Sequence, residues 1–468
     1  MKLEKITLEN FRCYQHLDID FHPNITVLAA NNGQGKTTIL DAVRIALWPY
    51  VSQFDLARTP SEIQTNTIFI DDVRVLKSLE QNSRMFGALD VMARQLPSSI
   101  TAIGQYDDNK TTWQRFRDSE AKNSRIKDDP GAKDLKASIK GLQVKIRDLN
   151  APPETLPIFG YYGTGRLWNE KRLTEGKKGT TEKTNEQIRT FAYRDCLDPA
   201  SSFKQFQDWF TSAYLKVMEY QIKQLEDGAT FIEVPDELRR PVKVVQDAVN
   251  AVLKPVGWQH LQYSEKYDKS LVLKHPVLGV MKISQLSDGI KNMLAMIADI
   301  AYRCVLLNGH LQDRAAKQSP GVVMIDEVDM HLHPQWQQTV IGSLREAFPT
   351  IQFIVTTHSP QVLSTVPKEC IRVLGVNSEG DDIAAAPLAA SYGEPSNDVL
   401  QAIMHVDPQP PVPEKYLLDE LTSLVDQGEY QSKRAKELLT ELKQKLNDQH
   451  PQILKIERSI RRQVALKG

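Results

Sequence analysis

A glycine-rich loop near the start of the chain carries residue types that bind phosphate. The loop and its flanks read NITVLAANNGQGKTTI from Asn24 to Ile39, with apolar residues before the loop and a helical pattern after it. Glycines let backbone N–H groups turn towards an anion, and a helix start adds the positive end of its dipole. Lys36 would reach the β- and γ-phosphate oxygens, and the Thr37 hydroxyl would hold Mg²⁺. Ala30 stands where the strict pattern has glycine, so an ordinary loop before a helix is the alternative.

Two acidic residues end an apolar run in the second half of the chain. Val322–Ile325 predicts a buried strand, and Asp326 and Glu327 follow it directly. In open α/β sheets, ligands bind at the carboxyl ends of the strands. There Asp326 would hold Mg²⁺ through water, and Glu327 would orient or deprotonate an attacking water. The alternative is a surface turn after a strand.

Three shorter patterns accompany this acidic pair. Leu286–Gly289 (LSDG) places a hydroxyl and open N–H groups at a helix start, which suits an anion but also an ordinary helix cap. His358 lies in the TTHSP motif after another apolar strand. It would hydrogen-bond a terminal phosphate, and the alternative is that its role is only structural. His331 and His333 have no third ligand placed by the sequence, so a metal site is not expected between them.

The composition places these motifs in a soluble globular protein of several structural units. The chain has 468 residues, 41% of them hydrophobic and 25% charged, with a net charge of −1. No global field therefore attracts nucleic acid, and a DNA contact would need a local patch. No apolar run approaches the ~20 residues of a membrane helix, and the N-terminus is not a signal peptide. The cysteines form no C-x-x-C pair, which fits a reducing cytoplasm: Cys13, Cys196, Cys304 and Cys370.

Strands and helices alternate around the motifs, which predicts a largely parallel sheet with helices packed on it. Two strands at an edge are expected at Leu3–Phe11 and Leu17–Phe21. Further strands are expected at Thr67–Val75 and Ser99–Tyr106, and Lys110–Arg117 would complete a hairpin. The charged segment Ser119–Asn150 is interpreted as a solvated helix or loop, and Lys171–Asn185 as a flexible loop. Four regions result: a first core part (1–170), a mainly helical lobe (171–282), a second core part (283–400) and a C-terminal helical region (401–468).

Taken in order, five motifs resemble the ABC-type ATPases of the RecF/SMC/Rad50 branch: ITLENFRCY, NNGQGKTT, LSDG, VVMIDE and TTHSP, over roughly Met1 to Leu374. The implied fold is α/β: a P-loop ATPase head with a mostly parallel sheet, an antiparallel edge sheet, a helical lobe and a C-terminal helical tail. The implied activity is hydrolysis of ATP, with ATP and Mg²⁺ as cofactors.

The resemblance assigns a role to each matching residue. Glu327 would be the catalytic base and His358 the γ-phosphate sensor, and Thr37 and Asp326 would hold the metal. Nucleotide contacts are implied for Asn31, Asn32, Gly33, Gln34, Gly35, Lys36, Thr37, Thr38, Ser287, Gly289, Arg12 and Arg166. Ser287 and Gly289 would contact ATP held by another copy, which implies a dimer or higher homo-oligomer. The family's Q-loop glutamine is not evident, and Gly163, Gly165 and Arg166 are expected to take its place.

Within this branch, the chain looks like prokaryotic defence ATPases such as PtuA of Septu and retron-linked systems, AriA of PARIS and the OLD proteins. The run Asp326–Pro334 and the TTHSP motif carry this likeness, and the tail Glu414–Lys467 resembles the helical C-terminus of PtuA-like proteins. Ser378–Asp382 faintly resembles the start of the OLD Toprim nuclease, but no Asp-x-Asp follows, and a hairpin turn is favoured. No His-Asn-His pattern is present.

A separate nuclease partner, such as a PtuB-like HNH protein, is therefore expected. The leading hypothesis is an ATP-binding and ATP-hydrolysing sensor and scaffold that regulates this partner in anti-phage defence. One alternative is a RecF-like DNA-repair or DNA-binding ATPase without a nuclease partner. The other is a nucleotide-gated scaffold that does not hydrolyse ATP.

Overall fold

The computed structural model describes residues 1–79, 90–107, 109–121, 124–148, 150–166, 188–199, 203–228 and 232–467. The loop expected at Lys171–Asn185 lies outside these described residues. The chain forms two compact units, Met1–Val399 and Leu400–Gly468, and each is described by itself. In the described part of the chain, none of the helices combines the length and the apolar character needed to cross a membrane.

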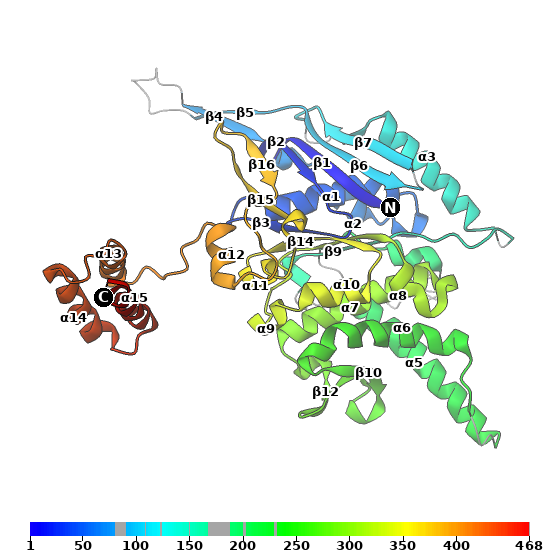
Figure 1. Cartoon of the computed structure of the whole chain (residues 1–468). Coiled ribbons are helices and arrows are strands. Elements are labelled where there is room, and N and C mark those ends of the chain that lie inside the picture. Colours follow the sequence, from blue (N-terminus) through cyan, green and yellow to red (C-terminus); the bar gives the residue numbers. More distant parts are fainter. Residues whose placement is uncertain are drawn as a thin grey trace. The chain divides into compact units, whose positions relative to one another are not determined.

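A six-stranded sheet forms the centre of the large unit (Figure 1). Its order is β16-β15-β3-β14-β13-β9, and all neighbours are parallel except the hairpin of β15 and β16. The strands are β3 (Ile25–Ala29), β9 (Ile158–Tyr162), β13 (Gly321–Ile325), β14 (Ile351–Thr357), β15 (Ile371–Val376) and β16 (Asp382–Ala385). The four strands β3, β9, β13 and β14 are buried along their whole length, which explains why their sequences are largely apolar.

An antiparallel sheet of order β2-β1-β6-β7-β8 lies beside the parallel one. It consists of β1 (Lys2–Phe11), β2 (Tyr14–Asp20), β6 (Ser98–Tyr106), β7 (Asn109–Arg117) and β8 (Lys127–Asp128). Helix α1 (Lys36–Val51) lies between the two sheets (Figure 1). Trp113 of β7 donates its indole N–H to Ala46 O of α1 at 2.7 Å, which ties this helix to the antiparallel sheet.

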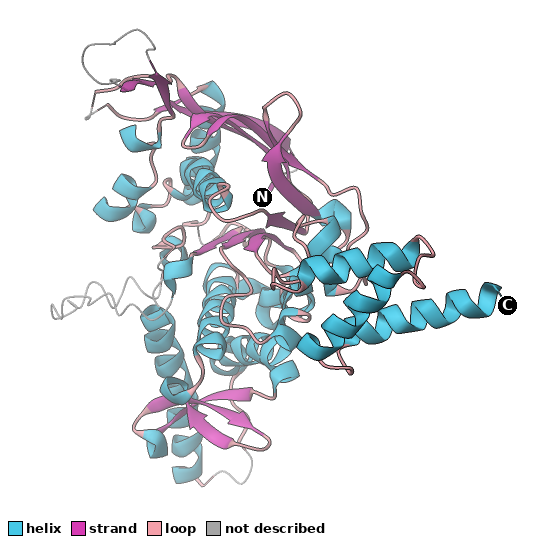
Figure 2. Ribbon diagram, turned by 90° about the vertical axis from the view of Figure 1, so that its left-hand side faces the viewer, coloured by secondary structure: helices cyan, strands magenta, loops and turns pink. Residues whose placement is uncertain are grey.

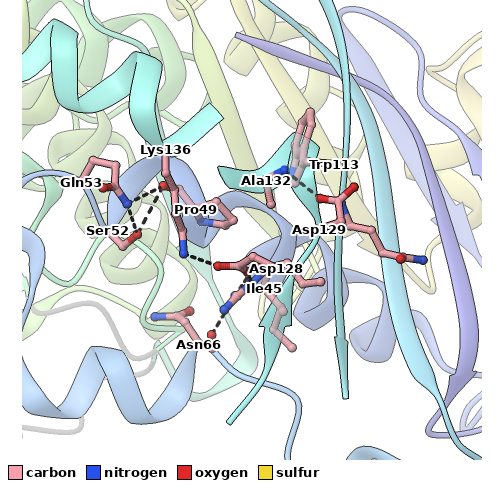
Figure 3. Close-up of polar contacts among 12 residues, drawn as sticks. Ile45, Pro49, Ser52, Gln53, Asn66, Trp113, Asp128, Asp129, Ala132 and Lys136 are labelled. Atoms are coloured by element: carbon pink, nitrogen blue, oxygen red, sulfur yellow. Dashed lines mark hydrogen bonds and ion pairs between the residues drawn. The ribbon is translucent and has the colours of Figure 1, made fainter. Parts of the chain in front are cut away.

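The structure corrects two expectations for the first region, one of them only in part. Helix α3 (Pro130–Lys145) is not fully solvated, since it buries Leu135 and Ile139 and its Lys136 pairs with Asp128 of β8 (Figure 3). The segment expected as a strand at Thr67–Val75 instead contains a 3₁₀ turn, Ile70–Asp72. There the Asp72 carboxylate accepts from the N–H of Phe69 at 2.9 Å, and this local bond replaces strand pairing. A hairpin of β4 (Val75–Leu79) and β5 (Asp90–Arg94) follows.

The helical lobe leaves the parallel sheet after β9 and returns to it at β13, the neighbouring strand, with Ile158 opposite Gly321. It contains α5 (Phe203–Glu226), α6 (Asp236–Leu253) and α7 (Asp288–Leu307), and a small antiparallel sheet seen at the bottom of Figure 2. That sheet consists of β10 (Gln259–Ser264), β11 (Ser270–His275) and β12 (Gly279–Lys282). Helix α7 is buried on almost all sides, so it is the central helix of the lobe.

Short helices complete the large unit. They are α2 (Pro60–Thr65), α8 (Ala315–Gln318), α9 (Pro334–Gln337), α10 (Val340–Ala347), α11 (Pro360–Leu363) and, at the boundary between the units, α12 (Ser396–Ala402). Helix α2 carries Glu62, whose side chain is buried, and this burial raises the pKa of its carboxyl group to about 8.

The C-terminal unit is a bundle of three helices with its own hydrophobic core. These are α13 (Lys415–Asp426), α14 (Lys433–Leu446) and α15 (Pro451–Lys467). All three contribute fully buried apolar side chains, such as Leu421, Leu438 and Ile453. Together with the two sheets and the lobe, this bundle confirms the α/β fold class expected from the sequence.

Candidate nucleotide-binding site

The glycine-rich loop joins β3 to α1 and has the backbone shape of a phosphate cradle. Gly33 and Gly35 adopt positive φ angles of 79° and 80°, which side-chain-bearing residues rarely adopt. A Cβ added at Gly35 would lie 2.3 Å from the Tyr14 hydroxyl oxygen, so this position also has no space for a side chain. Gly35 is the N-cap of α1 and offers no side-chain cap, so the first N–H groups of the helix suit an anion.

Lys36 is buried at the base of this loop, with 7% of its surface exposed. Its ammonium donates to the carbonyl oxygens of Ala30 at 2.8 Å and Asn31 at 3.1 Å. Burial lowers the pKa of Lys36, and the carboxylates of Asp326 and Glu327 act in the opposite direction. The ammonium and the acidic pair therefore lie within electrostatic reach of each other. Ala30 takes part through its carbonyl and has no positive φ, so its departure from glycine costs the loop nothing.

Side chains of the loop and of β2 hold the loop in shape. The Gln34 side-chain oxygen accepts from the Asn31 N–H at 2.9 Å, and the Tyr14 hydroxyl donates to Gln34 O at 2.8 Å. Asn31, Asn32, Gly33 and Gln34 are exposed, as a ligand-binding loop requires, whereas Thr38 is buried behind them. Tyr14 was missed by sequence reasoning, since only its position after Arg12 in the first motif could have drawn attention to it.

Thr37 and Asp326 meet as the sequence predicted for a magnesium site. The Thr37 hydroxyl donates to Oδ2 of Asp326 at 2.9 Å, and the Thr356 hydroxyl donates to Oδ1 at 2.6 Å. Asp326 is 3% exposed, and its backbone N–H donates to Tyr162 O at 2.8 Å. A hydroxyl and a carboxylate are hard oxygen ligands of the kind Mg²⁺ prefers. With Lys36 beside them, these residues fit a nucleotide triphosphate with its metal.

The strand order explains why residues so distant in the chain meet. Strands β3, β14 and β13 are parallel neighbours, with Thr357 opposite Ala29 and Val355 opposite Ile325. His358, which directly follows β14, is thus next to the start of the loop and is half-buried. The carboxyl ends of these strands form one edge, where the loop, the histidine and the acidic pair converge.

Glu327 has a strained backbone, with a φ of 49°. Its N–H donates to the Thr356 hydroxyl oxygen at 2.7 Å, so one buried threonine holds both members of the acidic pair. Left-handed conformations of residues other than glycine cost on the order of 1–3 kcal/mol and often occur at functional sites. This strain favours a functional role for Glu327 over the alternative that the segment is an ordinary surface turn.

The LSDG motif starts helix α7. Ser287 is the N-cap residue and is exposed, and in the described structure its hydroxyl makes no capping bond to the helix. Gly289 is buried, and a Cβ there would lie 2.3 Å from His331 O, so the helix start packs directly on the segment after β13. His333 caps α9 by accepting from the Gln335 N–H at 3.3 Å. Across the described residues, histidines, cysteines and acids nowhere gather in threes as a metal site would need.

The side chain of Arg12 is described by the structure, whereas that of Arg166 is not. Arg12 forms ion pairs of 2.7 Å with both Asp72 and Asp41, and Asp41 lies one helical turn after Thr37 on α1. Arg12 thus contacts the flank of the loop helix, and its predicted nucleotide contact stays a prediction. The backbone of Arg166 forms a 3₁₀ turn after β9, and its side chain lies outside the described part of the structure.

This chain is similar to known proteins in sequence and in structure. Residues 1–363 match the family described as AAA ATPase domain. The Retron Ec83 probable ATPase of Escherichia coli is 27% identical over 99% of this chain and 87% of that protein. Septu protein PtuA of Bacillus mycoides is 35% identical over 24% of this chain and 15% of that protein. Among solved structures, the SMC head domain from Thermotoga maritima covers 83% of this chain and 100% of that chain, at 14% identity and a TM-score of 0.42.

Proposed function

Because the chain belongs to the family of AAA ATPase domains, we propose that it binds ATP with Mg²⁺ at the loop edge and hydrolyses it to ADP and phosphate. The chain is related to retron ATPases over nearly its whole length, which confirms the resemblance predicted from the motifs. Beyond this activity, the proposal is that the protein assembles around ATP and regulates a separate nuclease in anti-phage defence.

The contact between Thr37 and Asp326 carries the ATPase proposal. Their two oxygens lie 2.9 Å apart at the end of the loop, where a bound Mg²⁺ would offset the charge of the phosphates. Lys36 supplies a fixed positive charge, and burial strengthens its attraction to an anion. Glu327 follows Asp326 at the same edge and would orient water or accept a proton. His358 lies beside the loop and would contact the terminal phosphate.

The exposed start of helix α7 supports assembly around ATP. Ser287 has an exposed hydroxyl without a capping bond, at the positive end of a 20-residue helix. Such an end attracts an anion, and in the proposed assembly the anion is the triphosphate held by a second copy. The two copies would then neutralise the phosphates from both sides, which stabilises the transition state electrostatically.

Regulation of a nuclease rests on the relatives. The matched proteins are named as a retron ATPase and as a Septu protein, and this sequence contains no nuclease pattern of the kinds considered above. In the proposed arrangement, a separate nuclease produces the defence response. Purification of the chain together with its native gene neighbours tests this, and recovery without any nuclease would refute it.

Two variants test the ATPase itself. Lys36→Ala is expected to abolish binding of a fluorescent ATP analogue, because the analogue's phosphates lose their buried cation. Glu327→Gln should retain binding and lose turnover by at least about 100-fold. Retained binding in the first variant, or normal turnover in the second, would contradict the assignment. A wild-type chain that binds ATP and never hydrolyses it would favour the nucleotide-gated scaffold instead.

A further inference from the structure

The last helix of the C-terminal unit has two opposite faces. Ile453 and Ile456 of α15 are buried in the core of the bundle. Lys455, Arg458 and Arg462 are exposed and follow each other at spacings of three and four residues. At 3.6 residues per turn these three side chains lie in one stripe, on the side of the helix opposite the two isoleucines. We call this stripe the α15 basic face.

The cations of this face lack the partners that most cations of the preceding helix have. Four of the five on α14 pair with carboxylates: Lys433 with Glu437, Arg434 with Glu420, Lys443 with Glu457 and Lys445 with Glu441, at 3.9, 2.7, 2.6 and 2.8 Å. Lys436 is the fifth. For Lys455, Arg458 and Arg462 the described structure contains no carboxylate within ion-pair distance. Three positive charges are therefore left uncompensated on one side of one helix.

The chemistry of the α15 basic face fits a phosphate backbone. Binding sites for proteins are anchored by buried aromatic or large apolar side chains. Between Lys455 and Arg462 the outward side carries only the small Ser459, and the exposed Val464 and Leu466 lie beyond the face, at the end of the helix. Phosphate contacts need positive charge at suitable spacing, and guanidinium groups bind phosphate with two parallel bonds. Arg462 lies seven residues after Lys455, which is a rise of about 10 Å along the helix. At 3.4 Å per phosphate along one strand, this length matches roughly three phosphates.

We propose that the α15 basic face binds the phosphate backbone of a nucleic acid, independently of base sequence and of ATP. The chain as a whole has a net charge of −1, so this contact depends on the local cluster and not on an overall field. The C-terminal unit has its own core, so the face can act without any change in the ATPase site.

Salt-dependent binding of the full chain to a labelled duplex of mixed sequence tests the proposal, by fluorescence anisotropy without nucleotide. The variant K455Q/R458Q/R462Q removes the three positive charges of the α15 basic face. The matched control K433Q/R434Q/K445Q removes the same charge from paired positions of α14. Three lost phosphate contacts should flatten the slope of log affinity against log salt by about 2.7. The wild-type affinity should then fall about 40-fold more than that of the face variant between 50 and 200 mM salt.

The control should keep the wild-type slope, and both variants should keep the wild-type ATPase rate and melting temperature, because all six side chains are at the surface. Equal flattening in both variants would overturn the proposal, since net charge alone would then explain binding. Absence of duplex binding by the wild type at 50 mM salt would overturn it as well. If labelled polyglutamate binds instead and the face variant loses it, the partner is an acidic protein and the nucleic-acid proposal is wrong.

Discussion

Thr356→Val is the sharpest test of how the acidic pair is held. The Thr356 hydroxyl donates to Asp326 at 2.6 Å and accepts from the N–H of Glu327 at 2.7 Å. Valine has nearly the same shape, so the change removes two hydrogen bonds and little packing. The site is 0% exposed, so solvent has no direct access to replace the hydroxyl.

The expected cost follows from the two bonds. A hydrogen bond to a charged group contributes about 1.5–3 kcal/mol, and a buried N–H left without a partner costs about 1–3 kcal/mol. Allowing for relaxation, Thr356→Val should lower the free energy of unfolding of the large unit by about 3 kcal/mol. Turnover should also fall by at least about tenfold, because Asp326 and Glu327 lose their common support. Thr356→Ser keeps the hydroxyl and should cost about 1 kcal/mol for the lost methyl group.

Guanidinium unfolding followed by tryptophan fluorescence measures this cost. All six tryptophans precede residue 400, so the signal reports only the large unit. ATP turnover is measured in parallel for the valine and serine variants. If the two variants unfold at the same denaturant concentration and turn over ATP at the same rate, the threonine does not hold the acidic pair and the reasoning fails.

Three further changes probe the composite site, the packing of α7 and a buried acid. Ser287→Arg should leave ATP affinity of the single chain unchanged and abolish ATP-dependent dimers of the Glu327→Gln background in light scattering; persistent dimers would contradict the composite site. Gly289→Ala should lower the melting temperature, because the new Cβ would lie 2.3 Å from His331 O; an unchanged melting curve would show that the helix start moves freely. The pKa of Glu62 is raised from 4.5 to about 8, so the folded state holds a proton that the unfolded state releases, and stability should fall as pH rises from about 4.5 to 8. Glu62→Gln should flatten that part of the pH profile of unfolding, and an unaltered profile would exclude Glu62 as its source.

The order of the motifs allowed much of the site to be predicted. Each motif ends a strand or starts a helix, and parallel strands bring such ends to one edge, so the meeting of Thr37 with Asp326 followed from pattern alone. The supports could not be predicted in this way. Thr356 was noted only as part of TTHSP, and its bonds to Asp326 and Glu327 depend on which strands are neighbours. The helical character of α3 was foreseen, but its buried face was not, because its long charged side chains mask the apolar stripe.

The path of the chain between β9 and β13 has a consequence for how such proteins diversify. The polypeptide leaves the sheet after Tyr162 of β9 and returns at Gly321 of β13, the adjacent strand. The lobe is therefore inserted between two neighbouring strands of the sheet. A change of length in the helices of the lobe leaves the register of β9 against β13 unchanged, so the lobe can vary while the edge that carries the glycine-rich loop is kept. The constraint falls on the parts of the lobe that contact the sheet. These are α7, which carries the LSDG turn, and the segment at Cys196 and Pro199, whose carbonyl oxygens accept from the N–H groups of Tyr161 and Gly163 at 2.9 and 3.0 Å. New surfaces can thus be acquired in the lobe, provided that these contacts with the sheet are kept.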